Sequence, residues 1–426
     1  MTAERILAAV EAGFEEQLEV TRALVRCPSV RGAEAPAQEL MARELGARGY
    51  AVERWTIDPD ELRGRRGFSP VDGVDYGNAL GVIGTLRAKA PRGRSLIFNG
   101  HVDVVPAGPL SMWRSPPFAP EVRDGWLHGR GAGDMKSGLV AALFAVEALR
   151  RAGLAPAADV QIHSVIEEEC TGNGALACVA RGHRADAVLI PEPMGEALLR
   201  AQVGVMWFQL KISGRPVHVA VADTGSNAIL AGWRLVSALQ QLAERWNARR
   251  ADDPHYRSGP RPINFNVGRI RGGDWASSVP AWCELECRIA LLPGQELAAA
   301  RAEIEACVRA AAAEDAFLRE SPPVVVWNGF QAEPFVAPSG SDAEGVLREC
   351  HAQVFGRALG ERAFTGTTDA RSYGLSGDMP VLVYGAVCEN MHGFDERVEL
   401  ASLRRVTGVL ALFIAEWCGV DGLSPG

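Results

Sequence analysis

The sequence has no stretch that is long and apolar enough to cross a membrane. No window of about 18 residues is both apolar and free of charge, so we expect no membrane-spanning helix and no membrane partner. The first residues carry acidic side chains throughout and lack the basic-then-apolar pattern of a secretory leader. A cytoplasmic location is therefore the expectation.

Cysteine pairs and basic clusters are missing as well. The nine cysteines are scattered, and no two of them form a CxxC pair. An odd number of cysteines in a long chain argues against a disulfide framework, and the lack of CxxC argues against zinc-finger and redox motifs. The 44 lysines and arginines are spread along a chain of net charge −8, which argues against a nucleic-acid partner.

Hydrophobic periodicity predicts a large α/β domain interrupted by a smaller one. Up to residue 198, strands alternate with helices, as in a largely parallel sheet covered by helices. Within 199–330 the order becomes β-α-β-β-α-β, which is the order of a split ferredoxin-like unit. The first pattern then returns. We predict one discontinuous domain, residues 1–198 and 331–426, and one inserted domain, residues 199–330.

Acidic residues and histidines gather next to predicted strand ends. The carboxyl ends of strands in an open parallel sheet are where ligands bind, so these loops are expected to converge. Imidazoles together with carboxylates suit Zn²⁺, Co²⁺ or Mn²⁺, and three adjacent glutamates would repel one another without a nearby cation. The five stretches are GHVDVVPAG (100–108), GRGAGDMKSG (129–138), IEEECTGNG (166–174), IPEPMG (190–195) and ENMHGFDERV (389–398).

Each stretch also has an ordinary structural explanation when it is taken alone. A His-x-Asp at a strand end can be a solvated tip, an aspartate at a glycine-rich turn can cap a helix, and three glutamates can form a solvated turn. The glycine-rich stretch could also hold a phosphate, but it lacks the GxxxxGK[ST] spacing. The metal hypothesis depends on all five stretches occurring together.

Taken in order, these stretches resemble the M20 metallopeptidase family, and most of all its acetylornithine-deacetylase-like and succinyl-diaminopimelate-desuccinylase-like deacylases. The resemblance covers nearly the whole chain and includes DGWLHGRGAGDMKSG, EEECTGNGALA, PEP and HGFDERV. It implies a zinc-exopeptidase-like mixed, largely parallel sheet between helices, which forms the catalytic metal-binding domain. It also implies that the inserted α+β domain forms a homodimer.

The resemblance implies a dinuclear metal site, with Zn²⁺ expected first and Co²⁺ or Mn²⁺ as alternatives. Glu168 would be the general base, and Asp103 would orient a metal-binding histidine. The peptide bond after the shared aspartate, Asp134, is expected to be cis. The implied metal ligands are His101, Asp134, Glu169, Glu192 and His392.

The resemblance also implies residues that meet the substrate. His218 would reach the active site of the partner subunit and stabilise the oxyanion. Many family members have an arginine where this chain has Ala290, and Arg288 lies two residues earlier on the same strand face. Arg371, in TTDARSYG, is a second candidate to bind a substrate carboxylate.

We therefore predict a metal-dependent amidohydrolase that removes an N-acyl group from an amino acid or a related small amine. A dipeptidase or carboxypeptidase of the same family is one alternative. A deformylase acting on an N-formylated amine is another, because the arginine clamp is altered. A non-catalytic binding protein would lack Glu168 or a metal ligand, and all of these residues are present.

Overall fold

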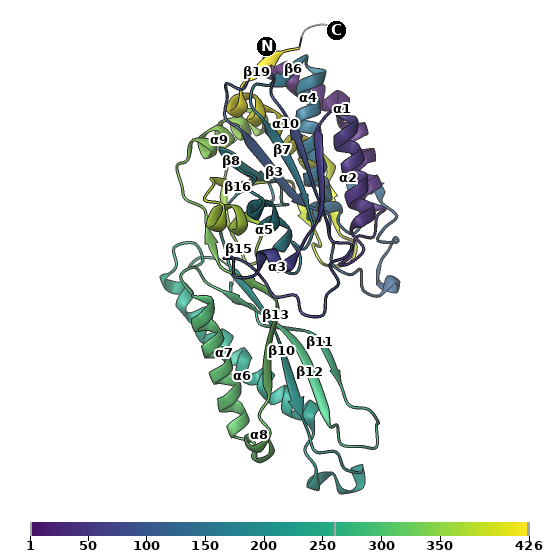
Figure 1. The fold of residues 1–426 in the computed structure, drawn as a ribbon, viewed down its shortest axis with the longest axis vertical. Coiled ribbons are helices and arrows are strands. Elements are labelled where there is room, and N and C mark those ends of the chain that lie inside the picture. Colours follow the sequence, from purple (N-terminus) through teal and green to yellow (C-terminus); the bar gives the residue numbers. More distant parts are fainter. Residues whose placement is uncertain (1, 260, 424–426) are drawn as a thin grey trace.

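A computed structural model describes residues 2–259 and 261–423 and shows a larger body joined by paired strands to a smaller one (Figure 1). The larger body is built on a six-stranded sheet. β3 pairs in parallel with β7 and β8, and β8 pairs in parallel with β16, whereas β1 and β2 are added antiparallel at one edge. The strand order is β1 (Ala51–Thr56), β2 (Leu80–Leu86), β7 (Val160–Val165), β3 (Leu96–His101), β8 (Ala187–Ile190) and β16 (Val381–Val383).

The central parallel strands β3 and β8 are buried on both faces, as expected for strands that read as continuous apolar runs, whereas the edge strand β1 is largely exposed. Leu96 and Phe98 of β3 pack into the larger core, whereas Ile97 between them packs into a second core with α5 (Asn173–Ala180). The larger core is formed mainly with α1 (Thr2–Val25), α2 (Ala35–Ala47), α4 (Ser137–Arg151), α9 (Asp342–Phe355) and α10 (Leu400–Cys418). Among the described residues, no helix is long and apolar enough to span a bilayer.

The smaller body is a four-stranded antiparallel sheet in the order β11-β12-β10-β13, with its own hydrophobic core. The β-α-β-β-α-β order confirms the predicted ferredoxin-like unit. Its main elements are β10 (Gly204–Ser213), α6 (Ala228–Ala248), β11 (Asn266–Gly272), β12 (Trp282–Leu291), α7 (Leu297–Ala313) and β13 (Val324–Ala332), with the short α8 (Ala316–Glu320) before β13.

The boundary between the two bodies follows from sheet membership. β9 (Leu198–Gln202) pairs with β14 (Phe335–Val336) and β15 (Glu361–Phe364), which belong to the larger body. The next strand, β10, already belongs to the smaller sheet. We therefore propose that the inserted domain runs from β10 to β13, slightly later at both ends than 199–330.

Several short strands have no counterpart in the sequence prediction, because two or three residues are too few to show a periodicity. Four of them form a small sheet that lies beside the glycine-rich turn before α4. These are β4 (Glu121–Arg123), β5 (Trp126–His128), β17 (Cys388–Glu389) and β18 (Arg397–Glu399). Two others, β6 (Leu154–Pro156) and β19 (Val420–Gly422), pair with each other. The short helix α3 (Pro59–Leu62) was likewise not predicted.

Candidate metal centre and active site

The structure brings the five expected metal ligands together beyond the carboxyl ends of the central strands. His101 ends β3, Glu169 follows β7, and Glu192 follows β8. Asp134 lies in the turn before α4, and His392 lies in the loop between β17 and β18. Parallel strands deliver their following loops to one edge of the sheet, so residues far apart in the chain meet there.

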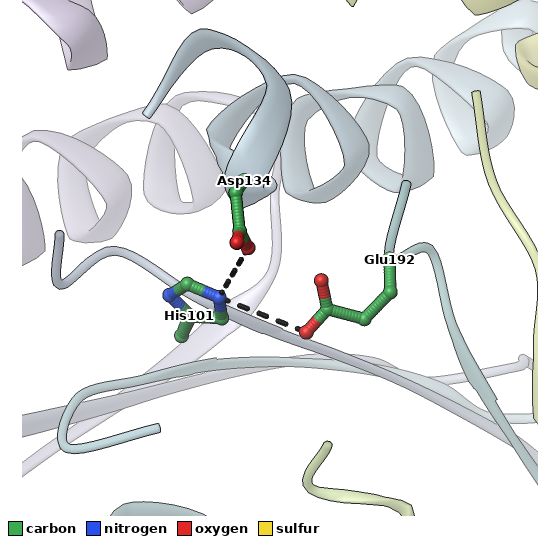
Figure 2. Close-up of side chains that lie close together, drawn as sticks. All are labelled: His101, Asp134 and Glu192. Carbon is green, nitrogen blue, oxygen red and sulfur yellow. Dashed lines mark hydrogen bonds and ion pairs between the residues drawn. The ribbon is translucent and has the colours of Figure 1, made fainter. Parts of the chain in front are cut away.

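Asp134 lies between the two histidines. Its Oδ1 is 3.2 Å from His101 Nε2, and its Oδ2 is 3.4 Å from His392 Nε2. Figure 2 shows His101 facing both Asp134 and Glu192, whose Oε1 is 3.6 Å from His101 Nε2. On the other side, Glu169 Oε2 is 3.0 Å from His392 Nε2.

Three groups of possible ligands overlap in this cluster, and two of them share Asp134. His101, Asp134 and Glu192 form the first of these two, and Asp134, Glu169 and His392 form the second. The remaining group is His101, Glu168 and Glu169. In each group the candidate ligand atoms lie within 4.8 Å of one another. Two imidazoles and three carboxylates, one of them shared, form a donor set that fits a pair of borderline-hard divalent cations.

The turn that carries Asp134 is fixed by a residue from another part of the chain. The Asp134–Met135 peptide bond is cis, as expected. The backbone N–H groups of Gly133 and Asp134 donate to Glu396 Oε1 at 2.9 and 3.1 Å. Arg130 Nη1 donates to the other oxygen of Glu396 at 2.6 Å. Glu396 and Arg130 are not among the predicted site residues, although both lie within the motifs HGFDERV and GRGAGDMKSG.

The ring of His101 is oriented by the main chain of Asp103 more closely than by its carboxylate. Nδ1 lies 2.9 Å from the Asp103 carbonyl oxygen and 3.5 Å from Asp103 Oδ1. Because a carbonyl oxygen only accepts, Nδ1 carries a proton, and Nε2 is the ring atom that would bind a cation. The Asp103 carboxylate accepts the backbone N–H of Glu169 at 3.1 Å, so it connects the two halves of the site.

Negative charge accumulates in this buried region. Burial raises the pKa of Glu168 well above its ordinary value, and repulsion from Glu192 and Asp369 raises it further. Burial, followed by repulsion from Asp134, does the same to the pKa of Glu192. Attraction to Glu169 raises the pKa of His392 to about 11. A buried cluster of this kind is costly without countercharge, and divalent cations would supply that charge.

A cavity of about 990 Å³ adjoins this cluster and is lined by both bodies. Glu168, Asp134 and His392 face it from the larger body, and Trp207 and Arg288 face it from the smaller one. A substrate in the cavity would therefore touch the candidate proton-transfer residue and the inserted domain at the same time. The larger apolar side chains of the wall are Met194, Trp207, Phe208, Phe330, Phe364 and Met391.

The two arginines predicted to bind substrate differ in position. Arg288 lines the cavity, and its two Nη atoms donate to the carbonyl oxygens of Asn264 and Thr365 at 3.1 and 3.2 Å. Arg371 is buried and does not line the cavity. It donates to the carbonyl oxygens of Thr368 and Thr171 at 3.0 and 2.9 Å, so its geometry supports a role in holding loops rather than in binding a substrate.

His218 is exposed and does not line the cavity of its own chain. It lies at the start of a helical turn in the inserted domain, where its Nδ1 accepts the backbone N–H of Ala220 at 3.1 Å. The proton of a neutral ring is therefore on Nε2, which faces away from that contact.

The fold and the imidazole–carboxylate cluster define a metal-dependent hydrolase. The chain belongs to peptidase family M20/M25/M40, whose model matches residues 97–416. Membership makes the protein a hydrolase of amide bonds.

Two curated relatives and one solved structure illustrate the range of the family. The chain is 28% identical to an N-formyl-4-amino-5-aminomethyl-2-methylpyrimidine deformylase of Halalkalibacterium halodurans, over 97% of each chain. It is 30% identical to a succinyl-diaminopimelate desuccinylase of Rhodopseudomonas palustris, over 92% of this chain and 96% of the relative. Human carnosine dipeptidase 1 has the same fold, with a TM-score of 0.79 at 15% identity over 98% of this chain and 99% of the other.

Proposed function

We propose that the protein removes an N-acyl group from a small amine or amino acid, with the help of two divalent cations. The observation that carries this proposal is the overlap of two ligand groups at Asp134, directly beside Glu168 and the cavity. A single-metal site would need only one of the two groups. The reaction would release a carboxylate and a free amine.

The residues around the shared aspartate divide into two sets. His101 and Glu192 would hold one cation with Asp134, and Glu169 and His392 would hold the other. Zn²⁺ suits this donor set best, and Co²⁺ or Mn²⁺ are the alternatives. Such cations, when bound, polarise the amide carbonyl and make water acidic enough to lose a proton near neutral pH.

Glu168 is proposed to move the proton. Its carboxylate lines the cavity, and Oε2 lies 3.8 Å from His101 Nε2. Glu168 also forms a group of possible ligands with His101 and Glu169, but the two groups that share Asp134 do not need it. It would accept a proton from the attacking water and return it to the leaving nitrogen, as a general base and then a general acid. Asp103 would keep the His101 ring and the Glu169 backbone in place during this step, through its carbonyl oxygen and its carboxylate respectively.

Arg288 is proposed to bind a carboxylate of the substrate. Burial alone lowers the pKa of its guanidinium to about 10, and no acidic side chain pairs with it within the described residues. A partly buried guanidinium that has only carbonyl partners gains from an anionic ligand. Arg371 is not proposed for this role.

A deformylase acting on an aromatic amine is the second candidate, and the cavity wall favours it. Trp207 and Phe330 pack edge to face with their ring centres 5.4 Å apart, and Phe364 also faces the cavity. Ala290 is buried and pairs with Val205 in the sheet, at the place where many family members have an arginine. These rings would offer a flat substrate more contact area than an aliphatic amino acid would use.

A homodimer formed through the inserted domain is also proposed. This domain exposes large apolar side chains that a monomer would leave in water: Leu230 and Trp233 of α6, Ile270 of the edge strand β11, and Trp275 in the loop after it. An unpaired edge strand beside exposed tryptophans is typical of an interface. His218 would then use its Nε2–H to stabilise the oxyanion in the partner's site.

The function is tested with metal-free protein that is reloaded with Zn²⁺, Co²⁺ or Mn²⁺. The substrates are formyl, acetyl and succinyl derivatives of amines with and without a carboxylate, together with dipeptides. Preference for acylated amino acids supports the first candidate, and preference for formylated aromatic amines supports the second. Hydrolysis of dipeptides alone would contradict both.

A further inference from the structure

Glu167, the residue before the proposed proton-transfer glutamate, is almost fully enclosed by side chains that donate to it. Arg31 forms two parallel hydrogen bonds, Nε to Oε1 at 2.6 Å and Nη2 to Oε2 at 2.9 Å. Thr171 Oγ1 donates to Oε2 at 2.8 Å, and the hydroxyl of Tyr76 donates to the same oxygen. The Glu167 side chain is only 3% exposed. A buried carboxylate with this many donors has a single position.

The backbone of Glu167 is anchored as firmly as its side chain. Its carbonyl oxygen accepts from the N–H groups of Thr171 and Gly172 at 3.0 and 2.6 Å, which closes the turn that contains Glu168 and Glu169. Its φ of +69° lies in the left-handed region, where a residue with a long side chain rarely stays without external restraint. The position of Glu168 therefore depends on what holds Glu167.

Arg31 reaches this turn from a distant part of the chain. It lies in the loop between α1 and α2, 136 positions before Glu167, and its side chain is one-third exposed at the cavity wall. It is the only cation that pairs with Glu167 within the described residues. Neutralising this carboxylate requires a cation, because Tyr76 and Thr171 bring no charge, and the planar guanidinium of Arg31 also matches both of its oxygens.

We propose that Arg31 is a positioning residue for the hydrolytic reaction, which acts through Glu167 to fix the carboxylate of Glu168 relative to the cavity. This inference rests on the proposed role of Glu168. Arg31 contributes no atom to the ligand groups around Asp134. Its removal should therefore change the rate of the chemical step rather than the number of bound cations.

The test compares Arg31→Met, Arg31→Lys, Glu167→Gln and the double variant Arg31→Met/Glu167→Gln in the metal-loaded enzyme. Loss of a residue that orients an active-site group costs about 10- to 100-fold in activity, so kcat of Arg31→Met should fall by that factor while KM stays within about twofold. Arg31→Lys should recover part of the loss, because it restores the charge without the fork. Arg87→Met, on an exposed arginine paired with Asp159, is the matched control.

The double variant separates positioning from other roles. If Arg31 acts only through Glu167, removing Arg31 should have no further effect once Glu167 is replaced, so kcat of the double variant should equal that of Glu167→Gln. Multiplied losses, a change in KM alone, or an unchanged kcat in Arg31→Met would each overturn the inference. Metal content and melting temperature are measured for every variant, and if Arg31→Met does not fold, Arg31→Lys and Glu167→Gln carry the same comparison.

The outcome also distinguishes this inference from the proposed function. If Glu168→Gln keeps wild-type turnover, the role of Glu168 fails and the positioning role fails with it. If Glu168→Gln is inactive and Arg31→Met is fully active, the function stands and only the positioning role is overturned.

Discussion

Replacing Glu168 by Gln should abolish most of the activity while it stabilises the metal-free protein. Gln has nearly the same size, so the 6%-exposed site keeps its packing and loses only a charge and a proton acceptor. General acid–base catalysis contributes about 10²- to 10⁴-fold, so kcat should fall by that factor, or about 2.7–5.4 kcal/mol of transition-state stabilisation.

The effect on stability has the opposite sign from that of most buried substitutions. Burial, and then repulsion from neighbouring carboxylates, raise the pKa of Glu168 in the folded metal-free protein. A raised carboxyl pKa means that the charged form opposes folding at any pH above the ordinary Glu value of about 4.3. Glu168→Gln removes this penalty, so the metal-free variant should melt higher than wild type at pH 7, and the difference should vanish below about pH 4.

The assay measures kcat and KM on the best substrate, metal content, and the melting temperature of metal-free protein at pH 7 and pH 4. Glu284→Gln, on the inserted domain, is the matched control and should change none of them. Unchanged turnover in a Glu168→Gln protein that holds its metals would refute the role of this residue. A lower melting temperature at pH 7 would refute the account of its electrostatics.

Three further predictions concern other parts of the molecule. Mixing His218→Ala with Glu168→Gln subunits should restore about one quarter of wild-type activity, because half of the dimers form one intact site across the interface; no recovery would refute catalysis in trans. Glu344→Gln should lower the free energy of unfolding by about 1–3 kcal/mol at pH 7, because two arginines hold the pKa of this buried carboxyl below its usual value against the effect of burial. The difference in free energy of unfolding between this variant and wild type should become smaller as the pH falls below about 4.3. Denaturation at several pH values measures it, and Glu349→Gln, on an exposed residue, is the control. Arg288→Met should raise KM for substrates that carry a carboxylate and leave KM for substrates without one unchanged; equal effects on both would contradict the clamp.

The long helices and strands could be predicted from the sequence because the spacing of their apolar residues reflects which of their faces are buried. β3 reads as a continuous apolar run because both of its faces are covered, and α4 is apolar nearly all round because it lies inside the larger core. The small sheet that includes β5 and β18 could not be predicted, since three residues carry no period. It is nevertheless this sheet that flanks the loop of His392 and the turn of Asp134.

The convergence of the proposed metal ligands could be predicted because each one lies within a recognisable motif at or after a strand end. The residues that hold those ligands in place could not be, because their partners are distant in the chain. Glu396 accepts from the backbone of Asp134 across 262 positions, and Arg31 reaches Glu167 across 136. The role of Arg371 in substrate binding, which its motif suggested, stays a prediction, and in the structure this side chain donates to the carbonyl oxygens of Thr368 and Thr171.

Elemental analysis of active protein tests the central claim most directly. The overlap of two ligand groups at Asp134 predicts two transition-metal ions per chain, with activity lost on chelation and regained on reloading. Asp134→Asn should lower the content below two and abolish turnover, because one side chain serves both groups. Fully active protein with one metal ion per chain, or with none, would contradict the account.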